Sequence, residues 1–467
     1  GSADADRPFR RRSRSRRGDT TAARLGTRHA RRSVALRRPN TLAKMASITA
    51  AARQDPSSSR ESVGPLAPVA PDSRIMEIDI VRGFALFLVL LENMHLFGAD
   101  SLAWTAVPDR LSFAFMEIFV ESKSWTLFSL LFGFGFALQL KRARAEGGSG
   151  LPAYLRRLAV LFALGAAHAL LFDGDILMLY AELGLGLLVI RRLSTRSLLL
   201  LAAALLLVFP LVRLDSQERP AGPNEVRRAR THLAQARRSH VYATGSVAEV
   251  AADNASAIPA DPLEDVATPE SGLAVFAMFL IGFSVGRSRL LRDIPGNAAA
   301  IARVRNWGLG LGLGAMALKQ ILAVATGYAV FRAQRAGPGA RLSGDLLFAY
   351  GTTALALGSA AALILAAQTR RGKAVLAPLD ATGRLSLSVY LTQTLMFTSL
   401  FYGYAFGQAF RLGPVAVTGW AVIFFAVQVV GCQWWSRRFL LGPMGWLWRS
   451  LTYLGWQPMR PARPSNP

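Results

Sequence analysis

The stretch "RRLAVLFALGAAHALLFDGDILMLYAELG", residues 156–184, consists of two apolar runs joined by the short polar segment "DGD". Each run is long enough to cross the hydrocarbon core of a bilayer as an α-helix, and the short joint predicts a tight helical hairpin. The runs nevertheless carry the polar side chains of His168, Tyr180 and Glu182. Because polar groups are costly in lipid, we expect them to face protein, a cavity or the water boundary.

Apolar runs of this kind recur along the whole 467-residue chain, of which 52% is hydrophobic. They predict an all-α polytopic membrane protein, a bundle of about ten transmembrane helices with a C-terminal interfacial helix. The predicted spans are residues 77–98, 118–140, 156–172, 175–191, 197–213, 273–290, 306–327, 344–368, 385–403 and 415–436. The lipid bilayer is therefore the first partner that the sequence implies.

The predicted spans fall into two blocks. The resulting segments are a basic N-terminal tail (1–73), a first membrane block of five helices (74–213), a polar extracytoplasmic loop (214–272), a second block of five helices (273–436) and a cytoplasmic tail (437–467). The loop contains the Ala/Arg-rich stretch "EVRRARTHLAQARRSH", which predicts a surface helix. The C-terminal tail is rich in tryptophan, which favours the membrane–water boundary and predicts an interfacial helix.

Of the net charge of +25, residues 1–44 carry +11, with fourteen Lys and Arg against three Asp and Glu, and the rest of the chain carries +14. Residues 1–73 lack apolar periodicity and are predicted to be disordered. A basic tail can bind anionic lipid or nucleic acid. However, Met45 opens a stretch of ordinary composition, so the alternative interpretation is that residues 1–44 are not part of the native working protein. We therefore expect no nucleic-acid partner.

The positive charges beyond the tail alternate between the two sets of span boundaries. One set of short boundary segments holds Lys141, Arg142, Arg144, Arg156, Arg157, Arg191, Arg192, Arg196, Arg287, Arg289, Arg292, Arg303, Arg305, Arg370, Arg371, Lys373, Arg384, Arg437 and Arg438, whereas the opposite set is sparse. Because short cytoplasmic loops carry an excess of Lys and Arg, this pattern predicts that both termini are cytoplasmic. The single cysteine, Cys432, allows no intrachain disulfide.

Polar residues recur at helical spacing along the first span. Asp79 and Arg82 are three residues apart and are therefore neighbours on a helix. Asn93 follows Arg82 by eleven residues, almost three turns, so it projects from nearly the same face about 16 Å further along. Glu92 and His95 lie at a similar depth on other faces.

The third span repeats this spacing, because Arg157 precedes His168 by eleven residues. Both helices are predicted to run from inside to outside, so they can line one passage. Arg82 and Arg157 would stand at its cytoplasmic mouth, with Asn93, His168 and Asp175 toward its outer end. Arginines bind phosphorylated ligands, and a histidine oriented by a carboxylate can act as a general base. The predicted catalytic residues are therefore His168 and Asp175.

Each of these residues has a structural alternative. Arg82 and Arg157 can anchor helix ends to lipid headgroups, and His168 can bond to a backbone carbonyl of a neighbouring helix. Asp175 is also well placed to cap the fourth span. Glu182, about 10 Å into that span by helical rise, is expected to be functional, because acids within a membrane are costly.

Five collinear blocks resemble a known family. They are "IDIVRGFALFLVLLEN", "FSLLFGFGFALQL", "YLRRLAVLFALGAAHALLFDGDILMLYA", "GRLSLSVYLTQTLMFTSLFYGYAFG" and "GPMGWLWRSLTY". With them, the chain from about residue 74 to 460 resembles the YeiB-like family of bacterial membrane proteins, also described as domain of unknown function 418. The chain departs from this family at Gly445, where a glutamate is common, and at Glu92 and His95, where apolar residues are usual. The resemblance implies the bacterial cytoplasmic membrane.

The first span is also similar to that of membrane acyltransferases related to heparan-α-glucosaminide N-acetyltransferase. In those enzymes an Arg-Gly followed by an Asn at this spacing belongs to the acyl-CoA site, and Arg82, Gly83 and Asn93 match it. The resemblance implies acetyl-CoA or another acyl-CoA as donor substrate and an extracytoplasmic acceptor such as a sugar. The predicted donor-binding residues are Asp79, Arg82, Gly83, Asn93, Arg157 and Arg384, and the further candidates are His95, Glu92, Tyr180 and Glu182.

Two other classes of function stay open from the sequence. A transporter of a small molecule also needs polar residues inside its spans, although no inverted repeat is visible between the two halves. A non-catalytic membrane subunit is the third class, and self-association of the chain is left open. The five histidines show no metal-binding spacing, so no metal is expected.

Overall fold

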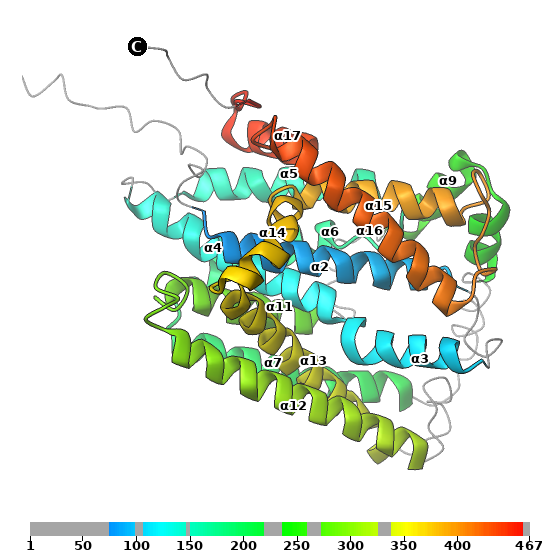
Figure 1. Ribbon diagram of the computed structural model, residues 1–467, viewed down its shortest axis with the longest axis horizontal. Coiled ribbons are helices and arrows are strands. Elements are labelled where there is room, and N and C mark those ends of the chain that lie inside the picture. Colours follow the sequence, from blue (N-terminus) through cyan, green and yellow to red (C-terminus); the bar gives the residue numbers. More distant parts are fainter. Residues whose placement is uncertain are drawn as a thin grey trace, which may run out of the picture. The chain divides into compact units, whose positions relative to one another are not determined.

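The structure is a computed structural model that describes residues 74–98, 106–145, 150–218, 236–258, 272–325 and 338–460. Every regular element within these ranges is a helix (Figure 1). The predicted disordered tail, residues 1–73, lies outside the described residues.

The helices of the first block follow one another with short connections. They are α2 (Met76–His95), α3 (Val107–Phe115), the π-helix η3 (Met116–Val120), α4 (Lys123–Ala145), α5 (Leu151–Ala169), α6 (Leu177–Ile190) and α7 (Thr195–Glu218). In the loop that follows, a short helix covers 236–244 and α9 covers Val247–Ala257. The predicted surface helix at 225–240 therefore lies mostly outside the described residues.

The second block begins at α11 (Gly272–Arg287). It continues with α12 (Ala298–Ala325), α13 (Pro338–Ala366), α14 (Arg370–Arg384), α15 (Ser386–Phe401), α16 (Pro414–Ser436) and α17 (Pro443–Tyr453). The helix α17 coincides with the interfacial helix expected from its tryptophans. The helix α14 was not expected, because it is amphipathic and its mean hydropathy is far below that of a span.

All ten predicted spans fall on helices. The second span covers η3 and α4 together, and each of the others falls on one helix, in chain order α2, α5, α6, α7, α11, α12, α13, α15 and α16. Within the part of the chain that the structure describes, three stretches are long and apolar enough to cross a membrane by length and composition, namely Thr195–Val212, Gly339–Ala366 and Pro414–Ser436. Helices α6 and α11 are apolar but shorter. The described residues thus have the character of a membrane protein, and the number of crossings stays a prediction.

Helix α2 packs against α4, α13, α14, α15 and α16 (Figure 1). Its contact with α14 is unusually close, because a methyl group at Gly83 would overlap the carbonyl oxygen of Leu379 and one at Gly383 would overlap that of Asp79. Small residues allow helix backbones to approach in this way. Gly83 therefore has a packing role in the fold.

Helices α2 and α5 run in the same direction. Arg82 and Arg157 near their first turns interact electrostatically. At the opposite end, the rings of Phe97 and Phe172 are 6.0 Å apart. We call the first end of the bundle the arginine end and the second end, where α2 finishes with His95, the histidine end.

Candidate functional site

His168 and Asp175 are in direct contact at the histidine end. His168 lies in the last turn of α5, and the turn that follows brings Asp175 back beside it. The Nδ1 atom of His168 is 2.7 Å from Oδ1 of Asp175, and the two side chains are 3% and 2% exposed. The second oxygen, Oδ2, accepts a hydrogen bond of 3.0 Å from the backbone N–H of Met178. Asp175 thus orients the imidazole and satisfies a backbone donor in the first turn of α6.

Gly165 makes this contact possible. A methyl group at Gly165 would lie 2.8 Å from Oδ2 of Asp175 and 2.7 Å from the backbone nitrogen of Met178. Both separations are shorter than real Cβ atoms show, so any larger residue would push α6 away from α5. Gly165 lies about one turn before His168, on the same face of α5.

The other ring nitrogen of His168 reaches the second block of helices. Its Nε2 atom is 2.7 Å from Oγ1 of Thr394 on α15, which is fully buried. The ring of Tyr390, one turn earlier on α15, lies 5.0 Å from the imidazole ring. Sequence reasoning missed Thr394, because only the folded chain brings α15 beside α5. Its one local signal is a hydroxyl within an apolar span.

The other polar residues of α2 face different neighbours. Glu92 accepts hydrogen bonds from the backbone N–H of Ser122, at 2.9 Å, and from the hydroxyl of Ser124. Nε2 of His95 is 2.9 Å from Oγ1 of Thr418. The side chain of Asn93 forms no hydrogen bond to another described residue. The structure therefore does not bring these α2 residues into contact with His168.

Part of the predicted outer loop packs over the α5–α6 turn. Arg238 donates a hydrogen bond of 2.8 Å to Asp173 and pairs with Asp253 on α9. Asn254 donates a hydrogen bond of 3.1 Å to the carbonyl oxygen of Leu170. The segment 236–258 therefore covers the end of α5 next to the His168–Asp175 pair.

The arginine end gathers five guanidinium groups. Arg82 pairs with Asp79 at 2.6 Å, and Arg384 pairs with Asp380 at 3.5 Å. The arginine cluster, as we name it, comprises Arg74, Arg82, Arg157, Arg384 and Arg449, each of which interacts electrostatically with at least one of the others. Neither Arg157 nor Arg449 forms an ion pair with a described residue. The cluster is thus richer in positive than in negative groups, which suits an anionic ligand.

Helix α17 holds one side of this cluster. Arg157 lies over the ring of Trp448, 4.5 Å from its centroid, and the indole N–H of Trp448 donates a hydrogen bond of 3.0 Å to the carbonyl oxygen of Arg157. Burial lowers the pKa of Arg449 to about 10, and neighbouring guanidinium groups act in the same direction. From the sequence, Arg449 was placed on an interfacial helix that anchors to lipid, with a role in a substrate site as the alternative.

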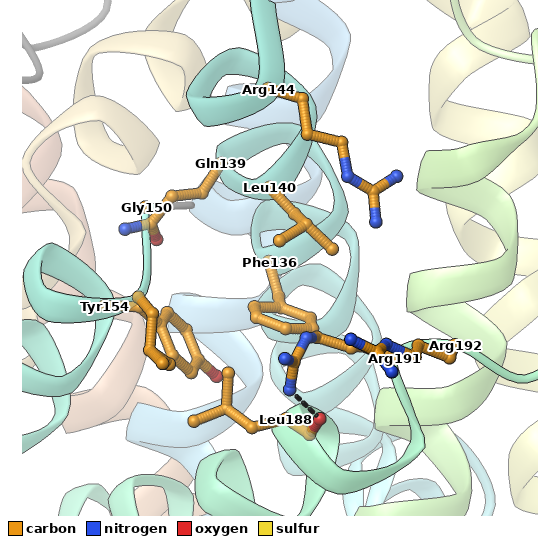
Figure 2. A pocket seen from close by; sticks show the side chains of 10 residues that line it. Phe136, Gln139, Leu140, Arg144, Gly150, Tyr154, Leu188, Arg191 and Arg192 are labelled. Carbon is orange, nitrogen blue, oxygen red and sulfur yellow. Dashed lines mark hydrogen bonds between the residues drawn. The ribbon is translucent and has the colours of Figure 1, made fainter. Parts of the chain in front are cut away.

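A pocket of about 200 Å³ opens beside the cluster, between α4, α5 and α6. Figure 2 shows Tyr154 and Gln139 on one side of Phe136, with Arg144 and Arg191 on the other. Gln139 links pocket and cluster, because its Oε1 accepts a hydrogen bond of 3.3 Å from Arg157. Its Nε2, like Nε of Arg157, is buried without a partner among the described residues. In the sequence, these pocket arginines indicated only the orientation of the chain in the membrane.

The two remaining candidates lie on α6. The hydroxyl of Tyr180 is 2.7 Å from that of Ser129 and donates to the carbonyl oxygen of Trp125 at 3.0 Å. Tyr180 therefore joins α6 to α4. The carboxylate oxygens of Glu182 are buried on the same helix. The hydrogen bonds of Tyr180 lead to α4 and not to His168.

Comparisons with known proteins identify similar chains. A family described as "Protein of unknown function (DUF418)" matches residues 285–455. The chain is 31% identical over 418 residues to the "Uncharacterized protein YxaH" of Bacillus subtilis (strain 168), covering 84% of this chain and 98% of the relative. It is 30% identical over 403 residues to the "Uncharacterized protein YeiB" of Escherichia coli (strain K12), covering 81% and 96%. The resemblance to the YeiB-like family is thereby confirmed.

A third relative, an uncharacterised 39.9 kDa protein of Bacillus acidopullulyticus, is 26% identical over 410 residues, covering 83% of this chain and 96% of the relative. No solved structure matches the chain. The names of these relatives assign no activity, so any function has to be argued from the site itself.

Proposed function

We propose that the chain, which belongs to the DUF418 family of proteins of unknown function, is a membrane acyltransferase. It would pass an acyl group, such as acetyl, from a cytosolic acyl-CoA to an extracytoplasmic acceptor such as a sugar. The arrangement of helix α5 is the observation that carries the proposal.

Helix α5 joins the two kinds of site that such a transfer needs. Arg157 near its start lies in the arginine cluster, and His168 near its end is backed by Asp175. Eleven residues of helix separate them by about 16 Å along the axis. Guanidinium groups hold phosphates through charge-assisted contacts. A histidine with an oriented ring can remove a proton from an acceptor hydroxyl.

In this proposal the chain crosses a bacterial inner membrane ten times, with both termini and the arginine end on the cytoplasmic side. The positive charges at short boundaries support this orientation. The phosphates of acyl-CoA would bind to the arginine cluster and the adjoining pocket. The histidine end would then face the acceptor.

Donor binding is tested with the full chain purified in detergent. Titration calorimetry with acetyl-CoA should show binding, and Arg82→Ala should weaken it by roughly tenfold to a hundredfold, since hydrogen bonds to charged groups contribute about 1.5–3 kcal/mol. Arg82→Lys should restore only part of the loss, because lysine cannot bind phosphate through two parallel bonds. The matched control is Arg289→Ala, an exposed arginine outside the cluster. Unchanged binding in Arg82→Ala would leave Arg82 as a partner of Asp79 only.

Transfer and transport are separated in proteoliposomes that carry acetyl-CoA labelled on both the acetyl and the adenine group. An acyltransferase delivers only the acetyl label to a sugar on the opposite side. A transporter moves both labels together. Movement of the adenine label would therefore contradict the proposal.

The orientation has its own test, made in a Cys432→Ser background. Cysteines introduced at the exposed positions His240 and Lys373 should react with an impermeant maleimide from opposite sides of the membrane. Labelling of both from the same side would overturn the proposed topology.

A further inference from the structure

We propose that Thr394 is the residue that carries the acyl group, through a covalent acyl-threonine intermediate. This inference rests on the proposed acyltransferase function. Asp175, His168 and Thr394 form a continuous chain of contacts, with 2.7 Å between Oδ1 of Asp175 and Nδ1 of His168 and 2.7 Å between Nε2 of His168 and Oγ1 of Thr394. A carboxylate, an imidazole and a hydroxyl in this order are the arrangement that activates a nucleophilic hydroxyl in unrelated folds.

The contact with Asp175 selects a tautomer of His168 that suits this role. An ionised carboxylate only accepts, so Nδ1 of His168 donates its proton to Asp175. In the neutral ring of this tautomer, Nε2 carries a lone pair that can accept a hydrogen bond from the hydroxyl of Thr394. A hydroxyl is a weak nucleophile until an adjacent base takes its proton. The histidine is therefore held in the tautomer that can do so.

Thr394 also differs from the other threonines of α15. Thr392 donates its hydroxyl to the carbonyl oxygen of Ser388, and Thr398 donates to that of Leu395. Such bonds to the preceding turn are the usual way in which a helical threonine satisfies its hydroxyl. The hydroxyl of Thr394 bonds instead to His168, across 226 residues of sequence.

Tyr390 adds a second polar group beside the chain of contacts. Its ring packs on His168, and its buried hydroxyl lies near the backbone of Ile176, with no acceptor for its proton among the described residues. A buried donor that has no acceptor is costly in a folded protein. During attack on a carbonyl carbon, the carbonyl oxygen gains negative charge and needs such a donor. Tyr390 is placed one turn before Thr394 and can supply it.

A covalent intermediate also suits a reaction in which the donor and the acceptor approach from opposite ends of the bundle. The donor enters from the arginine end and the acceptor from the histidine end. Thr394 lies eight residues into α15, about 12 Å from its start by helical rise. An acyl-threonine keeps the acyl group beside His168, so that CoA can leave toward the arginine end before the acceptor arrives from the histidine end.

The reaction balances in two steps. In the first, Oγ1 of Thr394 attacks the thioester carbon while Nε2 of His168 takes the hydroxyl proton; the C–S bond breaks, and the departing sulfur takes that proton and leaves as the free thiol of CoA. In the second, the acceptor hydroxyl attacks the new ester and gives its proton to His168. The oxygen of Thr394 leaves and recovers a proton from the same nitrogen.

The test uses the whole chain in nanodiscs with radiolabelled acetyl-CoA and an acid quench. The label should stay on the protein before acceptor is added, and peptide mass spectrometry should place one acetyl group on Thr394. Thr394→Val should lose the covalent label and at least a hundredfold of the transfer rate while it still binds acetyl-CoA. Thr394→Ser should keep both label and transfer. Thr398→Val, also fully buried on α15, is the matched control and should behave like the unchanged chain.

Each failure has a distinct meaning. If Thr394→Val transfers acetyl at the unchanged rate, or if no label maps to Thr394 while transfer proceeds, the covalent inference is wrong and the acyltransferase proposal stands. If the unchanged chain neither binds acetyl-CoA nor transfers acetyl, the proposed function itself fails. Should Thr394→Val not fold, the Thr394→Ser variant and the mapped label decide.

Discussion

Two histidines finish helices at the same end of the bundle, and each bonds to a threonine from a distant part of the chain. His168 reaches Thr394 at 2.7 Å, and His95 reaches Thr418 at 2.9 Å. The two sites differ in what contacts the second nitrogen of the imidazole ring. His168 has Asp175 on its other nitrogen, whereas His95 has no carboxylate partner among the described residues.

The second histidine belongs to a different kind of network. The hydroxyl of Thr418 is also hydrogen-bonded to that of Ser112, at 3.0 Å. His95 therefore ends a chain of hydrogen bonds between hydroxyl groups that joins α2 to α3 and α16. Without a carboxylate, nothing fixes the tautomer of its ring or stabilises an imidazolium. A histidine bonded to a threonine is therefore insufficient evidence of a catalytic base, and the oriented carboxylate is what distinguishes the two sites.

The largest expected effect separates the two histidines directly. His168→Gln should lower acyl transfer by about 10²–10⁴, the usual range for loss of a general base, with acetyl-CoA affinity nearly intact. His95→Gln should keep most of the activity, since glutamine can still bond to Thr418. Initial rates of transfer in proteoliposomes measure both. An active His168→Gln enzyme beside an inactive His95→Gln enzyme would reverse the assignment.

The second-largest effect is expected when the carboxylate of Asp175 is neutralised, because the two histidine sites then no longer differ in charge. Asp175→Asn keeps the size of the side chain and an oxygen for the N–H of Met178, but loses the charge behind His168. We expect the transfer rate to fall on the order of 10²-fold, less completely than in His168→Gln. The matched control is Asp173→Asn in the same turn, whose partly exposed pair with Arg238 should contribute little. Equal losses in both variants would indicate a role for the turn alone.

A smaller effect is expected when only the position of the carboxylate changes. Gly165→Ala would place a methyl group 2.8 Å from Oδ2 of Asp175, so α6 has to shift. Overpacking of this kind costs roughly 1–3 kcal/mol of stability. We expect a lower melting temperature and a transfer rate reduced by about tenfold, on the order of 1.4 kcal/mol in the barrier. Gly135→Ala on α4 meets nothing within 4 Å and should change neither quantity.

Local sequence features account for the helices and for one contact of the site. Long apolar runs suffice to locate α2 or α16, and the short turn after α5 suffices to bring Asp175 to His168. Contacts between helices that are distant in the sequence could not be predicted. Hydropathy gives no signal for the amphipathic α14, and no local spacing relates Thr394 to His168.

The arginine end shows the same limit. The spacing of Arg82 and Arg157 along their helices predicted that they share one end of the bundle, and the structure brings them within electrostatic range. Arg449 and Gln139 join them only because α17 and α4 pack against α5. Their role in donor binding stays a prediction.

The smallest expected effect concerns donor binding at the arginine end. It should leave the difference in transfer rate between the His168 and His95 variants unchanged. A side chain at Gly445 on α17 would meet nothing within 4 Å, and Arg449 lies four residues further along the helix. In Gly445→Glu the new carboxylate would therefore neighbour Arg449, which forms no ion pair with a described residue, and would compete with an anionic ligand. We expect acetyl-CoA affinity to fall by about threefold to tenfold in calorimetry, with the rate at saturating donor unchanged. Gly445→Gln adds a side chain of the same size without charge and should bind the donor normally, since both substitutions favour the helix equally. Equal weakening by the two variants would show that bulk at this position, and not the charge of Arg449, limits the donor.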